Sequence, residues 1–173
     1  MCAVDSDQLR IYCNDHLAAS AGGIGLVRRM LTHHGDDRWT RPLRELHDEL
    51  REERAELERT MAVLGMRRSR VKQLVVRVAE RLSRLKPDGS LGRGPLSTVV
   101  EFEFLSGAVL LKRAGFETLL GLSEVDRRID ASALERLIDQ ADRQHRWLAD
   151  ARREHAAATF GGRPERQDDA SDT

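Results

Sequence analysis

The sequence predicts an all-α protein, an up-down-down-up four-helix bundle with an additional amphipathic crossover helix. Apolar residues recur at helical spacing along most of the chain, no segment alternates convincingly as a strand, and prolines and glycines fall between the periodic segments. A chain of 173 residues can bury one hydrophobic core. We therefore expect a single bundle domain at residues 1–160. Residues 161–173 combine glycine, proline and charge with nothing apolar to bury, which predicts a disordered tail.

Five segments carry the helical periodicity, and proline residues mark three of their ends. Pro42 opens one segment, Pro87 closes another and Pro95 precedes a third, which is typical of helix boundaries. Helix ends can be placed from sequence to within about three residues. The expected helices comprise residues 7–31, 43–64, 69–86, 97–120 and 132–159.

The lengths of the connections predict how these helices are arranged. Residues 33–41 and 121–131 form short connections, and short loops join antiparallel neighbours. The connection at residues 65–96 contains the crossover helix, and a helix of about 17 residues spans about 25 Å. It is long enough to return along the bundle. The fourth expected helix should therefore run parallel to the second, which gives the up-down-down-up order.

Four of the expected helices carry polar or ionisable residues in the middle of an apolar stripe. A buried charge costs several kcal/mol unless it is paired, hydrogen-bonded or bound to a metal. Four such interruptions at one level therefore predict a shared site on the bundle axis, formed chiefly by His16, Glu53, Glu103 and His145. The interrupting residues are His16 in 7–31, Glu53 and Arg54 in 43–64, Glu103 in 97–120, and Gln144 and His145 in 132–159.

The helix expected at residues 97–120 is apolar on two sides, and both need to be covered. We expect the crossover helix at 69–86 to cover one side and a homodimer contact to form in addition. Glu103 lies within the first side and interrupts it. The first side contains Leu96, Val99, Val100, Leu110 and Ala114, and the second contains Phe102, Leu105, Val109 and Phe116.

Three short runs, at residues 12–16, 49–54 and 101–105, read YCNDH, ELREER and EFEFL. With two helical hairpins, a crossover and inward carboxylates and histidines, the chain resembles the ferritin-like four-helix bundles. The runs are also similar to those of an uncharacterised actinobacterial family. In ferritin-like di-iron proteins, two helices give one Glu each and two give Glu-x-x-His. The resemblance implies redox or iron-handling activity at a metal site formed by Glu53, Glu103, His16, His145 and Asp142.

The chain departs from the di-iron pattern at several positions. Asp142 replaces Glu in Asp142-x-x-His145, and Glu56 stands where the pattern has His. Arg54 places a fixed positive charge at the same level, which opposes a divalent cation and favours an ion pair with Glu53 or Glu103.

Three interpretations of the polar layer remain open from the sequence. The first is a buried ion-pair and hydrogen-bond network that includes Arg54 and Gln144 and fixes the helix register. The second is a site for iron, manganese or zinc, because carboxylate and imidazole ligands suit these ions. The third is a small-molecule pocket with acid–base groups. The corresponding functions are a ferritin-like protein with a metal in its core, or a non-catalytic structural or protein-interaction bundle.

Charge and cysteine usage limit the other classes of function. The chain is formally neutral, which argues against a protein that coats nucleic acid. Residues 67–86 nevertheless carry eight basic residues and one acid, so contact with nucleic acid or an anionic surface is a weak alternative. Cys2 and Cys13 cannot form a disulfide framework, which favours a cytoplasmic location, and no apolar run approaches the roughly 20 residues of a membrane span.

The chain uses arginine for nearly all of its positive charge. Of 29 basic residues, 26 are arginines, and the only lysines are Lys72, Lys86 and Lys112. This bias first indicates a GC-rich genome, and only second a use for the bidentate donors that arginine offers.

Overall fold

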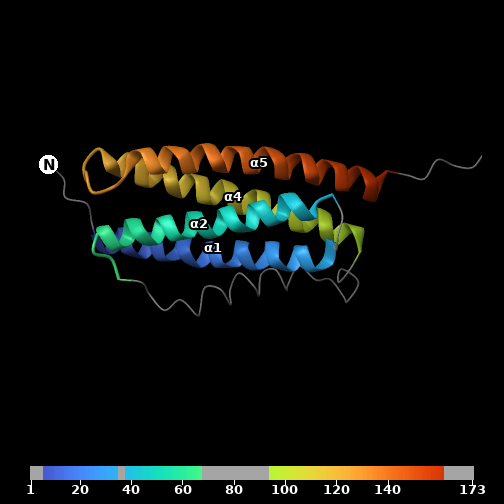
Figure 1. The fold of residues 1–173 in the computed structure, drawn as a ribbon, viewed down its shortest axis with the longest axis horizontal. Helices are drawn as coiled ribbons and strands as arrows, with labels where there is room; N and C mark the ends of the chain where they lie inside the picture. The colour runs from blue at the N-terminus through green and yellow to red at the C-terminus, as the bar shows by residue number, and fades with distance from the viewer. Residues whose placement is uncertain (1–5, 35–37, 68–93, 162–173) are drawn as a thin grey trace, which may run out of the picture.

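The computed structural model describes residues 6–34, 38–67 and 94–161, which form four long α-helices (Figure 1). Helix α1 comprises Ser6–His34, α2 Thr40–Val63, α4 Pro95–Ser123 and α5 Ala131–Phe160. Figure 1 shows two antiparallel hairpins, α1 with α2 and α4 with α5. Helix α4 runs in the same direction as α2, and α5 in the same direction as α1, so the order is up-down-down-up.

The prediction of an all-α, up-down-down-up four-helix bundle is confirmed. Each end of the four described helices lies within three residues of its position expected from the sequence. The expected crossover helix at 69–86, with its basic residues, and the tail at 162–173 lie outside the described residues. None of the described helices is both long enough and apolar enough to span a membrane.

Local sequence accounts for where the helices begin and end. Asp130 caps α5, because its side chain accepts a hydrogen bond from the backbone N–H of Ala133 at 3.0 Å. Helix α2 ends in a Schellman motif at Gly65, whose φ of 72° suits glycine. In this motif Met66 N–H donates to Met61 O at 2.8 Å and Gly65 N–H to Ala62 O at 3.0 Å.

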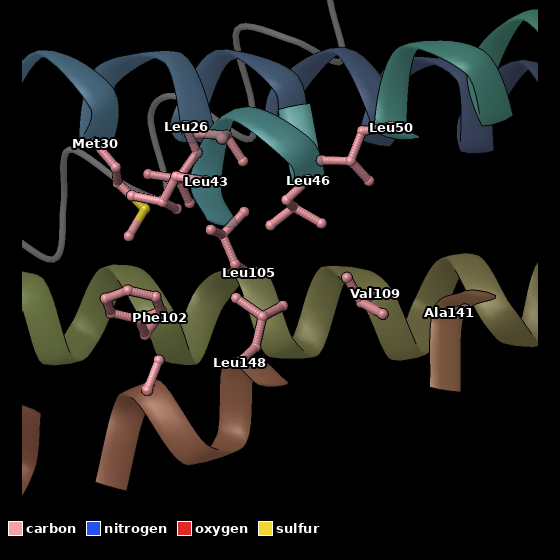
Figure 2. Close-up of a cluster of buried hydrophobic side chains, with 12 residues drawn as sticks. Leu26, Met30, Leu43, Leu46, Leu50, Phe102, Leu105, Val109, Ala141 and Leu148 are labelled. Atoms are coloured by element: carbon pink, nitrogen blue, oxygen red, sulfur yellow. The ribbon is translucent and has the colours of Figure 1, made fainter. Parts of the chain in front are cut away.

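The apolar core is divided into two clusters along the bundle. In the first, leucines of α1 and α2 face Phe102, Leu105 and Val109 of α4 (Figure 2). Leu50 belongs to this first cluster and Leu57 to the second, and Glu53 lies between them on α2. The second cluster comprises Leu9, Cys13, Leu17, Leu57, Met61, Phe116, Leu119, Ile129 and Leu134.

Candidate functional site

A buried polar layer separates the two apolar clusters and joins three helices. Glu53 of α2 and Gln144 of α5 are only 2% and 5% exposed. Lys112 of α4 reaches between them, and its Nζ lies 2.5 Å from Glu53 Oε2 and 2.5 Å from Gln144 Oε1. Gln144 Nε2 donates to Glu53 Oε1 at 2.8 Å and to Glu49 Oε2 at 2.7 Å. The layer is therefore an ion pair completed by hydrogen bonds from a neutral amide.

Burial and charge act in opposite directions on the two ions of this layer. Burial raises the pKa of Glu53, and the neighbouring Lys112 ammonium offsets part of that rise. Burial likewise lowers the pKa of Lys112, while the Glu53 carboxylate favours its charged form. The proton between these two groups is therefore held less firmly on nitrogen than it would be in water.

The sequence favoured an ion pair of Arg54 with Glu53 or Glu103, but Arg54 pairs with neither residue. Its Nη1 donates to the backbone carbonyl of Leu17 and, at 2.7 Å, to the Ser20 hydroxyl, both on α1. Its Nε lies 3.2 Å from Glu58 on its own helix. Arg54 thus links α2 to α1 beside the polar layer.

His16 is half-buried where α1 meets α4. Its ring lies over Gly115 of α4, and a Cβ added at that glycine would come within 2.6 Å of the ring Cε1. The Tyr12 ring lies beside it, with a centroid separation of 4.5 Å. Burial lowers the pKa of His16, although Asp15 opposes this in part, so the neutral imidazole is favoured.

The expected convergence on the axis is wrong for Glu103, His145 and Asp142. The Glu103 side chain is 52% exposed and lies 3.6 Å from Arg152 Nη1. His145 Nδ1 is 3.0 Å from the Ser106 hydroxyl, and Asp142 Oδ1 accepts from Arg113 Nε at 2.6 Å. These three residues make pairwise contacts between α4 and α5, separate from the contacts of Glu53.

The sequence interpretation missed Lys112 because it followed the wrong side of α4. The buried side of α4 is the second apolar side, and Lys112 interrupts it at the level of Glu53. The spacing along this side alternates strictly between three and four, which is a signal that could have identified Lys112. The positions concerned are Phe102, Leu105, Val109, Lys112, Phe116 and Leu119.

The donor set around Glu53 does not fit the metal that the ferritin-like resemblance implies. In the described part of the chain, no group of three or more His, Cys, Asp or Glu side chains is placed to hold a metal ion. The cation in contact with Glu53 is instead the Lys112 ammonium. A lysine ammonium has three donors and no acceptor, so it can balance a carboxylate but cannot ligate a metal.

A cavity of about 50 Å³ adjoins the polar layer between α1, α2 and α4. Its wall is mainly apolar, and Glu53, Lys112 and His16 also contribute to it. A space of this size holds a few water molecules. Two exposed residues of α4 that line it, Ala108 and Leu111, mark the side on which it reaches solvent.

Comparison of this chain with protein-family models, with curated proteins and with solved structures found no match. The assignment of a function therefore rests on the geometry of the polar layer and of the adjoining cavity.

Proposed function

We propose that this chain is a structural or protein-interaction bundle whose buried polar layer fixes the register of its helices. The observation that carries this proposal is the position of Lys112 between Glu53 and Gln144, with all three side chains largely withdrawn from water. Both oxygens of Glu53 and both N–H groups of Gln144 take part in this network. A buried polar network whose groups are all hydrogen-bonded is typical of a structural element.

The physical reason is the cost of any other register. If α4 moved by one helical turn along α2, the Lys112 ammonium would face apolar side chains without its carboxylate. An unpaired buried charge costs about 3–5 kcal/mol, which strongly disfavours the shifted arrangement. An apolar residue at position 112 would carry no such penalty.

We also propose that the bundle self-associates as a homodimer through α4. Leu96 and Leu110 are 40% and 46% exposed, respectively, on this one helix, and neither lines the cavity. Exposed apolar side chains gathered on one element are typical of a protein contact. A cytoplasmic location accords with a Cys13 thiol that is buried and free of any disulfide.

The register proposal is tested by replacing the whole layer at once with apolar residues. In the triple variant Glu53→Leu, Lys112→Leu, Gln144→Leu, we expect a helical protein as stable as the wild type or more so, because buried ion pairs are often replaceable by apolar residues. We further expect broadened or duplicated amide resonances, from helices that adopt more than one register. A single sharp spectrum with the wild-type pattern of long-range contacts would contradict the proposal.

Elemental analysis tests the proposal against the ferritin-like alternative. The protein should be purified without chelators and without a metal-affinity tag. We expect no stoichiometric transition metal. Iron, manganese or zinc at a fixed ratio to protein would favour the metal-binding function instead.

The homodimer is tested by sedimentation at micromolar concentration. We expect a dimer for the wild type and a monomer for Leu96→Glu combined with Leu110→Glu. The matched control is Val63→Glu combined with Val125→Glu, which introduces the same two charges at exposed residues outside α4. A wild-type monomer, or equal dissociation by the control, would contradict the α4 interface.

A further inference from the structure

The cavity and the polar layer share two residues. Lys112 and Glu53 form the buried ion pair, and both also line the apolar cavity between α1, α2 and α4. The Lys112 side chain thus lines an apolar space and ends in a primary amine, whose nitrogen lies 2.5 Å from a carboxylate oxygen. This combination is the one that nucleophilic lysines need, namely a desolvated amine with a nearby proton acceptor.

The Lys112 ammonium has a third N–H group with which it can bind a ligand. Lysine has three N–H donors. Within the described residues, the contacts with Glu53 and Gln144 account for two of them. The third can be given to the oxygen of a small carbonyl compound whose apolar part occupies the cavity.

We propose that the cavity binds a small, largely apolar aldehyde or ketone, which condenses reversibly with the Nζ of Lys112 to form an imine. The apolar wall selects the body of the ligand, and the amine selects its carbonyl group. This goes beyond a role in helix register, because the same ion pair then also serves as a covalent binding site.

The use of lysine at this position supports the proposal. The chain meets its need for positive charge with arginine at 26 of 29 basic positions. Arginine stays protonated at any physiological pH, whereas a buried lysine can give up its proton. Burial lowers the pKa of Lys112, which favours the neutral amine that the reaction needs.

Lys112 and Glu53 supply every proton transfer that the condensation requires. The Lys112 ammonium first passes a proton to the Glu53 carboxylate. The neutral Nζ then attacks the carbonyl carbon; the new N–C bond forms, and a proton moves from nitrogen to the carbonyl oxygen. Glu53 returns its proton to that hydroxyl, the C–O bond breaks and water leaves. The product is a C=N bond protonated on nitrogen and paired with the Glu53 carboxylate.

The test is reductive trapping on the intact wild-type chain. The protein is incubated with acetaldehyde, which is small enough for this cavity, and with cyanoborohydride, which reduces any protonated imine to a stable secondary amine; peptides are then analysed by mass spectrometry. Because the chain has only three lysines, the other two, Lys72 and Lys86, serve as internal references. We expect Lys112 to be modified before either of them. Modification of Lys72 or Lys86 ahead of Lys112 would overturn the proposal.

A matched pair of variants tests whether the cavity is the route to Lys112. Ala108 is exposed and lines the cavity, whereas Ala114 is exposed on the same helix and lies outside the wall. We expect Ala108→Phe to lose the labelling of Lys112 while the other lysines still react, and Ala114→Phe to label like the wild type. Equal labelling in both variants would overturn the cavity assignment. Equal labelling of Lys112 by the polar aldehyde glyoxylate would overturn the apolar ligand class.

Discussion

The ring of His16 lies directly over the Cα of Gly115, so α1 and α4 approach each other at a point where one of them has no side chain. The ring Cε1 and Nδ1 would lie 2.6 Å and 2.8 Å from a Cβ at position 115. These separations are shorter than van der Waals contact allows, so any larger residue must displace the imidazole.

Gly115→Ala should therefore lose stability in the wild type and gain it when His16 is removed. Overpacking costs about 1–3 kcal/mol, whereas alanine is favoured over glycine inside a helix by about 0.5–1 kcal/mol. Urea unfolding of Gly115→Ala in the wild type and in a His16→Ala background measures the coupling between the two residues.

The control for this cycle is Gly107→Ala on the same helix. A Cβ at Gly107 meets nothing within 4 Å, so only the helix-propensity gain should be observed. Equal effects of Gly115→Ala in the two backgrounds would contradict the close contact with His16.

Removal of the Lys112 charge alone should strongly lower the free energy of unfolding. Lys112→Met leaves the Glu53 carboxylate buried without its partner, and breaking one half of a buried pair costs about 3–5 kcal/mol. Arg113→Met is the matched control, because its pairs with Asp142 and Glu117 are half-exposed or exposed, and such pairs contribute little to stability. Unfolding free energies of similar size in the two variants would mean that the Lys112 pair is not structurally important.

The raised pKa of Glu53 should make the stability of the protein depend on pH. Because burial raises its pKa, the folded state binds this proton more tightly than the unfolded state. The resulting contribution to the free energy of unfolding is complete below pH 4.5, the ordinary pKa of a glutamate. It is lost as the pH rises through the higher pKa of Glu53 in the folded state. The charged and amide groups that face the carboxylate are Lys112, Glu49 and Gln144.

The measurement compares the wild type with Glu53→Gln by urea unfolding at a series of pH values. Relative to the variant, the wild type should lose unfolding free energy as the pH increases from about 4.5, the ordinary carboxyl value. A difference that stayed constant, or that increased with pH, would show that the pKa of Glu53 is not raised.

Cys13 should be unreactive in the folded protein. Its side chain is 1% exposed, and burial raises the pKa of its thiol to about 11. Since the thiolate is the nucleophile, iodoacetamide at pH 8 should leave Cys13 unmodified until the protein is unfolded in urea. Peptide mass spectrometry distinguishes Cys13 from Cys2. Rapid native labelling of Cys13 would indicate that the cavity side of α1 opens readily.

The sequence predicted the helices well and the polar layer only in part. Periodicity and prolines placed every described helix end closely, and the stripes of α2 and α5 correctly identified Glu53 and Gln144 as inward residues. Helix α4 offered two apolar sides of similar quality. Which side is buried depends on where the neighbouring helices lie, and the sequence of α4 does not contain this information. Because the wrong side was chosen, Glu103 instead of Lys112 was predicted as the residue that α4 contributes to the polar layer.

His145 illustrates a second limit of the same kind. It follows Gln144 directly, and one residue rotates a side chain by about 100° around the helix. That rotation is enough to move His145 from the axis to the contact with Ser106. A stripe drawn from sequence is wide enough to include both residues, and only the packed neighbours decide between them.

Helix α2 packs along α1, and α4 packs along α5, whereas the polar layer joins α2 to the α4–α5 hairpin through Glu53, Lys112 and Gln144. Loss of this layer would therefore leave the two hairpins in contact mainly through α1 and α4. In hydrogen-exchange experiments on a variant without the Lys112–Glu53 pair, the centres of α1 and α2 should lose protection together, while the centres of α4 and α5 stay protected. The bundle is thus a pair of hairpins, and the first opening should occur between them.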